Sequence, residues 1–390
     1  MKYNFDKPVS RENTSSVKYD LRSKVFGRSD IIPMWVADMD FQTPDFILGA
    51  IRKRLQHETL GYTFIPDSFF QAIMNWNFRR HGWQIQKEWI SFSPGVVPAL
   101  NLLVMALTRP GDKIIVQPPV YFPFFSAVQN HGRILVRNPL RYEKERYRMD
   151  FEQLSSCLDE KVSMLILSNP HNPTGNVWDK EVLLELARCC LERNIIMLSD
   201  EIHCDLIFPG SRHLPLAGLS PSIASQTVTC MAPSKTFNLA GLSTSYLVIP
   251  NPELKKKYDT LLDQVHVGAG NIFGFTALEA AYGEGEEWLR QLMLYLQENL
   301  DFLTGFIQQH LPRIKVIKPE ATYMVWIDCR ELGMKKEELR DFMICRAGLG
   351  LSDGFLFGEE GEGFQRINIA CPRSVLEKAL CQLRDAVDGI

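Results

Sequence analysis

Short apolar runs alternate with helical patterns through the middle of the chain. Residues 98–107 and 180–193 have the apolar rhythm of helices. Five apolar runs have the length and composition of buried strands: Lys113–Gln117, Met164–Ser168, Ile195–Ser199, Thr227–Met231 and Leu242–Ile249. Strands that alternate with helices predict βαβ units and a mostly parallel sheet. Because the runs are almost continuously apolar, helices are expected on both faces of that sheet.

The pattern changes after about residue 285. A long amphipathic helix is predicted over residues 286–309, followed by strand-like and helical stretches at 314–317, 323–328, 335–346, 364–370 and from Ser374 onward. This order is typical of an α+β unit. The first 40 residues show little pattern and are expected to wrap against that unit or against a partner subunit. We therefore predict a large domain over residues 45–285 and a smaller one formed by 1–44 and 286–390.

Composition narrows the class of protein. The chain has 390 residues, of which 45% are hydrophobic and 23% charged, with a formal net charge of −3. This is the profile of a globular protein, and the absence of a basic stripe argues against nucleic acid as a partner. No stretch reaches the roughly 18 apolar residues of a membrane span. The charged N-terminus does not resemble a signal peptide, so we expect a cytoplasmic protein that acts on a small molecule.

The cysteines point the same way. There are nine of them, an odd number, and none forms a CxxC pair or a zinc-binding spacing. In a chain of this length they are interpreted as buried thiols in a reducing cytosol. A catalytic cysteine stays as the alternative interpretation, and no metal site is predicted.

Polar side chains follow four of the predicted strands. They are Tyr121 after the first, Asn169–Asn172 after the second, Asp200–His203 after the third and Ser234-Lys235 after the fourth. Ligands of parallel sheets bind outside the carboxyl ends of the strands. The sequence therefore predicts that these residues form one site.

These residue types match what pyridoxal 5'-phosphate (PLP) requires. Its aldehyde needs a lysine, for which Lys235 is placed, and its ring nitrogen needs a carboxylate, for which Asp200 is placed. Its phosphate needs backbone N–H groups, best supplied at a helix start such as Gly95-Val96-Val97. Tyr121 can stack on the ring and Asn172 can bond its oxygen.

Each residue also has a structural interpretation when it is taken alone. Lys235 can be a surface or ion-paired lysine, and Asp200 a helix cap or ion-pair partner. Asn172 can belong to a tight loop, and Tyr121 can be a core residue. Gly95-Val96-Val97 can be a plain helix start. Only their joint order along the chain favours one binding site.

The string Asn169-Pro170-His171-Asn172-Pro173-Thr174-Gly175 resembles the NPHNPTG signature of fold-type I, aminotransferase-like PLP enzymes. Asp200 follows Asn172 by 28 residues and Lys235 follows Asp200 by 35, spacings similar to those of that family. The resemblance extends from Trp35 to Arg373. It implies the fold-type I PLP-dependent transferase fold, an α/β fold whose large domain has a mostly parallel seven-stranded sheet, beside a smaller α+β domain.

The resemblance also implies roles for individual residues. Lys235, Tyr121 and Asp200 are expected to be catalytic, and Lys235 to hold PLP covalently. The remaining expected cofactor contacts are Gly95, Val96, Val97, Asn172, His203, Ser234 and Tyr62. Arg366 is expected to bind the substrate carboxylate and Ala37 to lie beside the substrate. Tyr62 resembles a tyrosine that reaches the phosphate of the neighbouring subunit, which implies a homodimer with shared active sites.

Three segments are similar to the MalY/PatB type of cystathionine β-lyase. They are residues 37–41, 199–203 and 358–364. His203 stands where most aminotransferases of this fold have a tyrosine, although it can also be a histidine without a special role. The resemblance implies a C–S β-lyase that converts L-cystathionine, related cysteine S-conjugates or cysteine to pyruvate, ammonia and a thiol. An aminotransferase, or a regulatory protein that binds a transcription factor, remain the alternatives.

Overall fold

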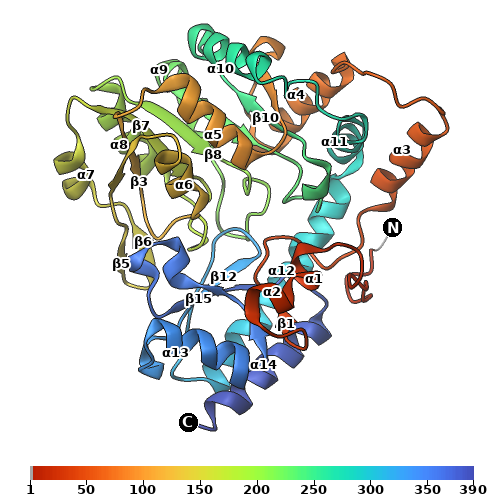
Figure 1. Ribbon diagram of the computed structural model, residues 1–390, viewed down its shortest axis with the longest axis vertical. Coiled ribbons are helices and arrows are strands. Elements are labelled where there is room, and N and C mark those ends of the chain that lie inside the picture. The colour runs from red at the N-terminus through yellow and green to blue at the C-terminus, as the bar shows by residue number, and fades with distance from the viewer. Residues whose placement is uncertain (1–2) are drawn as a thin grey trace.

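A seven-stranded sheet forms the centre of the larger part of the molecule (Figure 1). The structure, a computed structural model, describes residues 3–390. The strand order is β2-β10-β9-β8-β7-β3-β4, and only β10 runs antiparallel to its neighbours. The strands are β2 (Ile90–Ser93), β3 (Lys113–Val116), β4 (Ile134–Arg137), β7 (Val162–Ser168), β8 (Ile196–Asp200), β9 (Thr227–Met231) and β10 (Ser245–Val248). The predicted fold class, α/β with a mostly parallel seven-stranded sheet, is confirmed.

Alternate residues of these strands enter different cores. Ile114 and Val116 pack with the helices on one face, whereas Ile115 packs with those on the other. This follows from the period of two along a strand. The first face is covered by α5 (Val96–Leu107), α6 (Pro123–Gln129) and α10 (Pro252–Gln264), and the second by α8 (Lys180–Leu191) and α9 (Pro221–Ser225). Both faces are therefore buried, as the apolar strands predicted.

The smaller sheet has four antiparallel strands in the order β11-β12-β15-β14. It lies in the blue part of Figure 1. Its elements are β11 (Lys315–Ile317), β12 (Met324–Asp328), β14 (Ser352–Asp353) and β15 (Phe364–Asn368), with helices α12 (Glu286–His310), α13 (Lys336–Asp341) and α14 (Arg373–Val387). The helix predicted over 335–346 changes character, because α13 ends at Asp341 and a π-helical turn, Phe342–Arg346, follows. The domain limits at residues 45 and 285 stay a prediction.

The N-terminal segment lies against this smaller sheet, beside α12 and α14 (Figure 1). Its elements are α1 (Val17–Asp20), α2 (Arg22–Phe26) and β1 (Ile32–Pro33), and β1 pairs in parallel with β13 (Leu349–Gly350). The Asn368 amide donates to the Met34 carbonyl at 3.0 Å. Of the two positions expected for the segment, the structure therefore shows the one against the smaller domain.

Two helices connect the N-terminal segment to the sheet. They are α3 (Asp45–Leu55) and α4 (Asp67–His81), which both pack on α11 (Ile272–Glu284). A short hairpin of β5 (Arg141–Glu143) and β6 (Arg146–Arg148) and helix α7 (Phe151–Cys157) complete the larger part. None of the helices in the described part of the chain is both long and apolar enough to cross a bilayer.

Several predicted limits are wrong in instructive ways. The strand expected from Leu242 begins only at Ser245, because Leu242 ends a 3-10 turn and Ser243 has a left-handed backbone with φ of 47°. Helix α5 begins at Val96, two residues before the expected start. Strands β2 and β4 were not predicted, since two of the four residues of β2 are serines and Ile134 on β4 is exposed.

Candidate active site

A cavity of about 340 Å³ lies at the carboxyl ends of β3, β7, β8 and β9. The structure brings most of the predicted site residues to its wall: Ala37, Gly95, Val96, Val97, Tyr121, Asn172, Asp200, His203, Ser234 and Lys235. Arg366 lies directly behind Asn172, to which it is hydrogen bonded. Tyr62 is the exception, because its side chain is fully exposed in the loop between α3 and α4.

Lys235 points its ammonium group at the N-terminal segment. Its Nζ donates to the Ala37 carbonyl oxygen at 2.7 Å, and the same oxygen accepts from the Tyr323 hydroxyl at 3.0 Å. Burial lowers the pKa of Lys235 to about 8, Arg366 acts in the same direction, and Asp38 opposes them. Part of the Lys235 population is therefore neutral near pH 7.5, and a neutral amine is the form that attacks an aldehyde.

Asp200 ends β8 at the floor of the cavity. It is 5% exposed, and its carboxylate accepts a hydrogen bond from the Ile202 amide at 3.2 Å. Burial raises the pKa of Asp200 to about 7. No ion pair of this carboxylate is formed within the described residues, and the positive charge of Lys235 offsets burial only in part, so the carboxylate still needs a cation close by. A protonated pyridine nitrogen from a bound cofactor meets that need.

Arg366 on β15 is a buried cation without an ion pair within the described residues, as Asp200 is a buried carboxylate without one. It is 3% exposed, and its Nη1 donates to Asn172 Oδ1 at 2.8 Å while Nη2 donates to the Trp35 carbonyl at 3.1 Å. Burial lowers the pKa of Arg366 to about 10. Its hydrogen-bond partners within the described chain are all neutral, and Nε has none. A buried guanidinium of this kind fits the carboxylate of a substrate.

The start of α5 forms another wall of the cavity. Gly95 caps the helix with φ of 152°, and a Cβ added there would lie 3.3 Å from Pro98 Cδ. No side chain caps the first amides of α5, and Val96 and Val97 line the cavity. Free amides at the start of a helix bind phosphate, because they donate hydrogen bonds along the positive end of the helix dipole.

His203 and Tyr121 occupy the remaining walls. Burial lowers the pKa of His203 to about 3, helped by the positive charges of Lys235 and Arg366, so the imidazole is neutral at physiological pH. His203 Nδ1 is buried without a hydrogen-bond partner. Burial raises the pKa of Tyr121. Both rings therefore reach the cavity as neutral groups.

Other residues of the site were not predicted. Ser168, Ser243 and Thr244 also line the cavity. Because β10 is antiparallel, its amino end lies at the edge where the parallel strands have their carboxyl ends, and this places Ser243 and Thr244 there. Tyr323 belongs to the smaller domain and contacts the site through Ala37. Only the direction of β10, which its apolar pattern does not reveal, would have identified the two hydroxyl residues.

The model of the family "Aminotransferase class I and II" matches residues 29–383. The chain belongs to this family. It is 43% identical to the cystathionine β-lyase PatB of Bacillus subtilis over 98% of this chain and 100% of that protein. The predicted family resemblance is thus confirmed.

Solved structures agree with this assignment. The structure is similar to cystalysin from Treponema denticola, which contains PLP, with a TM-score of 0.96 and 35% identity over 100% of both chains. It is also similar to the PLP-bound C–S lyase from Staphylococcus hominis, with a TM-score of 0.93 and 35% identity over 99% of this chain and 98% of that one. The buried Asp200, the uncapped start of α5 and Lys235 fit the ring nitrogen, the phosphate and the aldehyde of this cofactor.

Proposed function

We propose that the protein is a PLP-dependent C–S β-lyase that converts L-cystathionine, related cysteine S-conjugates or cysteine to pyruvate, ammonia and a thiol. The observation that carries the proposal is that Lys235 and Asp200 line one cavity, with Arg366 hydrogen bonded to Asn172 of its wall, and that neither Asp200 nor Arg366 forms an ion pair within residues 3–390. Similarity to the cystathionine β-lyase PatB and to the C–S lyase of Staphylococcus hominis supports the reaction type.

Residues of the cavity would hold the cofactor by its different groups. Gly95, Val96, Val97 and Ser234 are assigned to the phosphate, Tyr121 to the ring face, Asp200 to the ring nitrogen, and Asn172 and His203 to the ring oxygen. Asn172 suits this role because Arg366 occupies its Oδ1 and leaves the amide N–H groups available. When bound, PLP supplies an aldehyde that takes up the substrate amine and a protonated ring that withdraws electrons from Cα.

The chain's own residues orient the substrate and move its proton. Arg366 binds the α-carboxylate, and Ala37 shapes the wall beside it. Lys235, once its amine is free, removes the Cα proton, and the electron pair of that bond expels the Cβ sulfur. Lys235 returns the proton to the departing thiolate. Hydrolysis of the remaining unsaturated amino acid gives pyruvate and ammonia, so no external acceptor is consumed.

The acceptor requirement distinguishes the two enzyme classes. The family also contains aminotransferases, which need a 2-oxo acid to turn over. Incubation of the holoenzyme with L-cystathionine alone is expected to release pyruvate and a free thiol in equal amounts. Turnover that depends strictly on an added 2-oxo acid would contradict the lyase assignment. A panel of cystathionine, cystine, cysteine and djenkolate, scored for pyruvate, then ranks the substrates.

We also propose a cytoplasmic homodimer with shared active sites. The nine cysteines are all free, and free thiols are typical of proteins in a reducing compartment. The loop between α3 and α4 exposes Leu60, Tyr62 and Phe64 to 60% or more, which is typical of a surface that another chain covers. Tyr62 would then reach the phosphate held by the partner subunit.

Hybrid dimers test the sharing of sites. A dimer of one Lys235→Ala chain and one Tyr62→Ala chain contains one site with both wild-type residues if Tyr62 serves the other subunit. Such hybrids are expected to regain close to half of the wild-type activity per dimer. If Tyr62 serves its own chain, every site in the hybrid lacks one residue and activity stays at the level of the Tyr62→Ala parent or below.

A further inference from the structure

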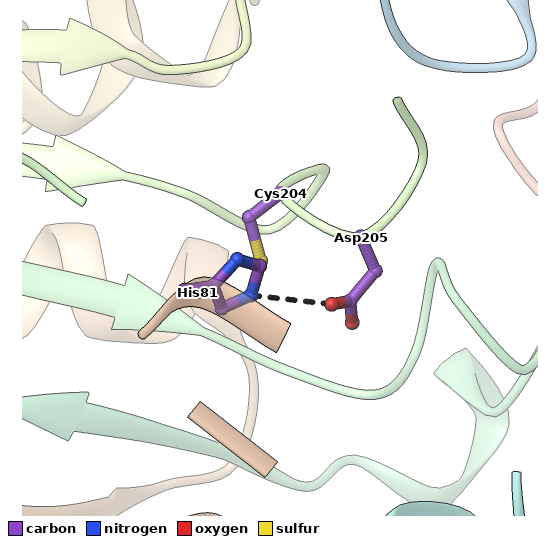
Figure 2. Close-up of side chains that lie close together, drawn as sticks. All are labelled: His81, Cys204 and Asp205. Carbon is purple, nitrogen blue, oxygen red and sulfur yellow. Dashed lines mark ion pairs between the residues drawn. The ribbon is translucent and has the colours of Figure 1, made fainter. Parts of the chain in front are cut away.

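A second group of reactive side chains lies outside the proposed PLP cavity. His81 ends α4, and Cys204 and Asp205 follow β8 (Figure 2). One ligand atom from each lies within 4.8 Å of the others. None of the three lines the PLP cavity, so the lyase reaction does not explain them.

The ring of His81 faces the carboxylate of Asp205. Its Nε2 forms an ion pair with Asp205 Oδ1 at 3.2 Å, marked by the dashed line in Figure 2. His81 is 8% exposed and Asp205 is 2% exposed. A nitrogen and an oxygen that both ligate one tetrahedral Zn²⁺ at about 2.0–2.2 Å are separated by roughly 3.4 Å. The observed spacing therefore already suits an ion held by both atoms.

Cys204 supplies a donor of a different kind. Its side chain is 5% exposed and reaches the same point as the His81 ring. A thiolate, an imidazole and a carboxylate together favour zinc over magnesium or calcium, which prefer oxygen ligands only. Binding releases the thiol proton, and the charges of thiolate and Asp205 then neutralise the divalent ion.

Neighbouring residues hold Asp205 in place. Its carboxylate accepts hydrogen bonds from Trp76 Nε1 at 3.1 Å and from Thr236 Oγ1 at 2.9 Å. Such bonds orient a metal ligand and tune its basicity. Arg80 Nε lies 3.8 Å from Asp205 Oδ1, and its positive charge opposes the binding of a cation there. Arg80 also pairs with Glu286. Thr236 directly follows Lys235 in the chain, so the hydrogen bond from Thr236 to Asp205 connects the group to the segment of the active-site lysine.

The group is open to solvent on one side. His81 and Cys204 line a surface cavity of about 610 Å³, together with His213 and Arg212. An ion can enter there, and a water molecule can complete a tetrahedral shell of three protein ligands. We propose that His81, Cys204 and Asp205 bind one Zn²⁺ ion with water as the fourth ligand. By fixing Asp205, which accepts a hydrogen bond from Thr236, the ion would stabilise the position of the segment that carries Lys235.

Crystals of the holoenzyme grown with Zn²⁺ test the site directly. Data collected on both sides of the zinc absorption edge are expected to show one anomalous peak between the three side chains. Absence of that peak, or a peak elsewhere such as at the exposed Cys345, would overturn the proposal. This measurement needs no variant, so it remains decisive if a substitution impairs folding.

Calorimetric titration with Zn²⁺ tests the ligands one by one. Wild-type holoenzyme is expected to bind one equivalent per chain, and Cys204→Ser and His81→Gln to weaken the affinity by at least about tenfold, the low end of effects seen around metal sites. Cys190→Ser is the matched control, because Cys190 is equally buried but lies on α8. Unchanged affinity in Cys204→Ser, or an equal loss in Cys190→Ser, would contradict the assignment.

Discussion

Charged side chains are buried both in the PLP cavity and in the N-terminal segment, but only the N-terminal segment pairs them within the chain. Lys18 Nζ lies 2.7 Å from Asp40 Oδ2, and Arg11 bridges Asp38 and Asp40 at 2.5 and 2.8 Å. Lys18 is 1% exposed and Asp40 is 4% exposed. In the cavity, Asp200 is buried to a similar degree, yet it forms no ion pair within residues 3–390.

The difference distinguishes buried charges that stabilise the fold from buried charges that bind a ligand. A buried charge without a partner costs several kcal/mol, whereas a buried pair recovers much of that cost. The N-terminal cluster therefore stabilises the fold and fixes the segment that carries Ala37. The cavity instead retains the unfavourable charges of Asp200 and Arg366, and we infer that cofactor and substrate supply the partners. The predictions below test that distinction, beginning with the largest expected effect.

Loss of Lys235 should have the greatest consequence in the cavity. Lys235→Ala is expected to lose the visible absorption band of the lysine-bound cofactor and to lower pyruvate release by more than about 10³-fold, because anchor and base are removed together. Absorption spectra and initial rates measure both effects. Lys256→Ala, which alters an exposed lysine of α10, should behave as wild type. Normal turnover in Lys235→Ala would remove this lysine from the mechanism.

Neutralising one aspartate in each region should change stability in opposite directions. Asp40→Asn leaves Lys18 buried without its closest counter-charge and is expected to lower the free energy of unfolding by about 3 kcal/mol. Asp200→Asn removes an unpaired buried charge and is expected to stabilise the cofactor-free protein at pH 8. Urea unfolding of both variants measures the effects, and a loss of stability in both would end the distinction.

The contribution of Asp200 to the free energy of unfolding should depend on pH. Its pKa is raised from 3.8 in the unfolded chain to about 7 in the fold, so the native state binds the proton more tightly. The stability from this group is fully present below pH 3.8 and is lost as pH rises through 7, in total about 4 kcal/mol. The advantage of Asp200→Asn over wild type should therefore grow between pH 4 and pH 8 in cofactor-free protein. A constant difference would contradict the raised pKa.

Arg366 should affect binding more than stability. Arg366→Ala removes a charge-assisted contact to the substrate carboxylate worth about 1.5–3 kcal/mol, so KM should rise by roughly 10- to 100-fold. The matched control is Arg373→Ala. Arg373 begins α14 and donates a hydrogen bond to Asn299, so its loss should leave KM near the wild-type value. An unchanged KM in Arg366→Ala would exclude it from the carboxylate role.

Tyr62 should give the smallest effect, because a single hydrogen bond is changed. Tyr62→Phe keeps the ring and removes only the hydroxyl, so the affinity for PLP is expected to fall by about threefold to tenfold. Equilibrium dialysis of the dimer against PLP measures this, with Phe64→Leu in the same exposed loop as control. Equal affinity in Tyr62→Phe and wild type would show that the hydroxyl does not contact the phosphate.

The mostly parallel sheet could be predicted from the sequence, but the reversed direction of β10 could not. The run Thr227–Met231 forms β9 with the predicted limits, because five apolar or β-branched residues in sequence have few alternatives to a buried strand. Strand β10 is equally apolar, and nothing local shows that it is antiparallel. Direction depends on the path of the connecting chain, and the placement of Ser243 and Thr244 depends on direction.

Site residues that lie at or near the end of a predicted strand could be predicted from the sequence. Asp200 and Lys235 could be singled out because Asp200 ends the apolar strand β8 and Lys235 lies four residues after β9, and folding does not change proximity along the chain. Contacts between distant residues could not be. The bond from Arg366 to Asn172 spans 194 residues, and His81 on α4 lies close to Cys204 and Asp205 in the turn after β8. No zinc spacing exists in the sequence for that reason: tertiary packing alone brings the three ligands together.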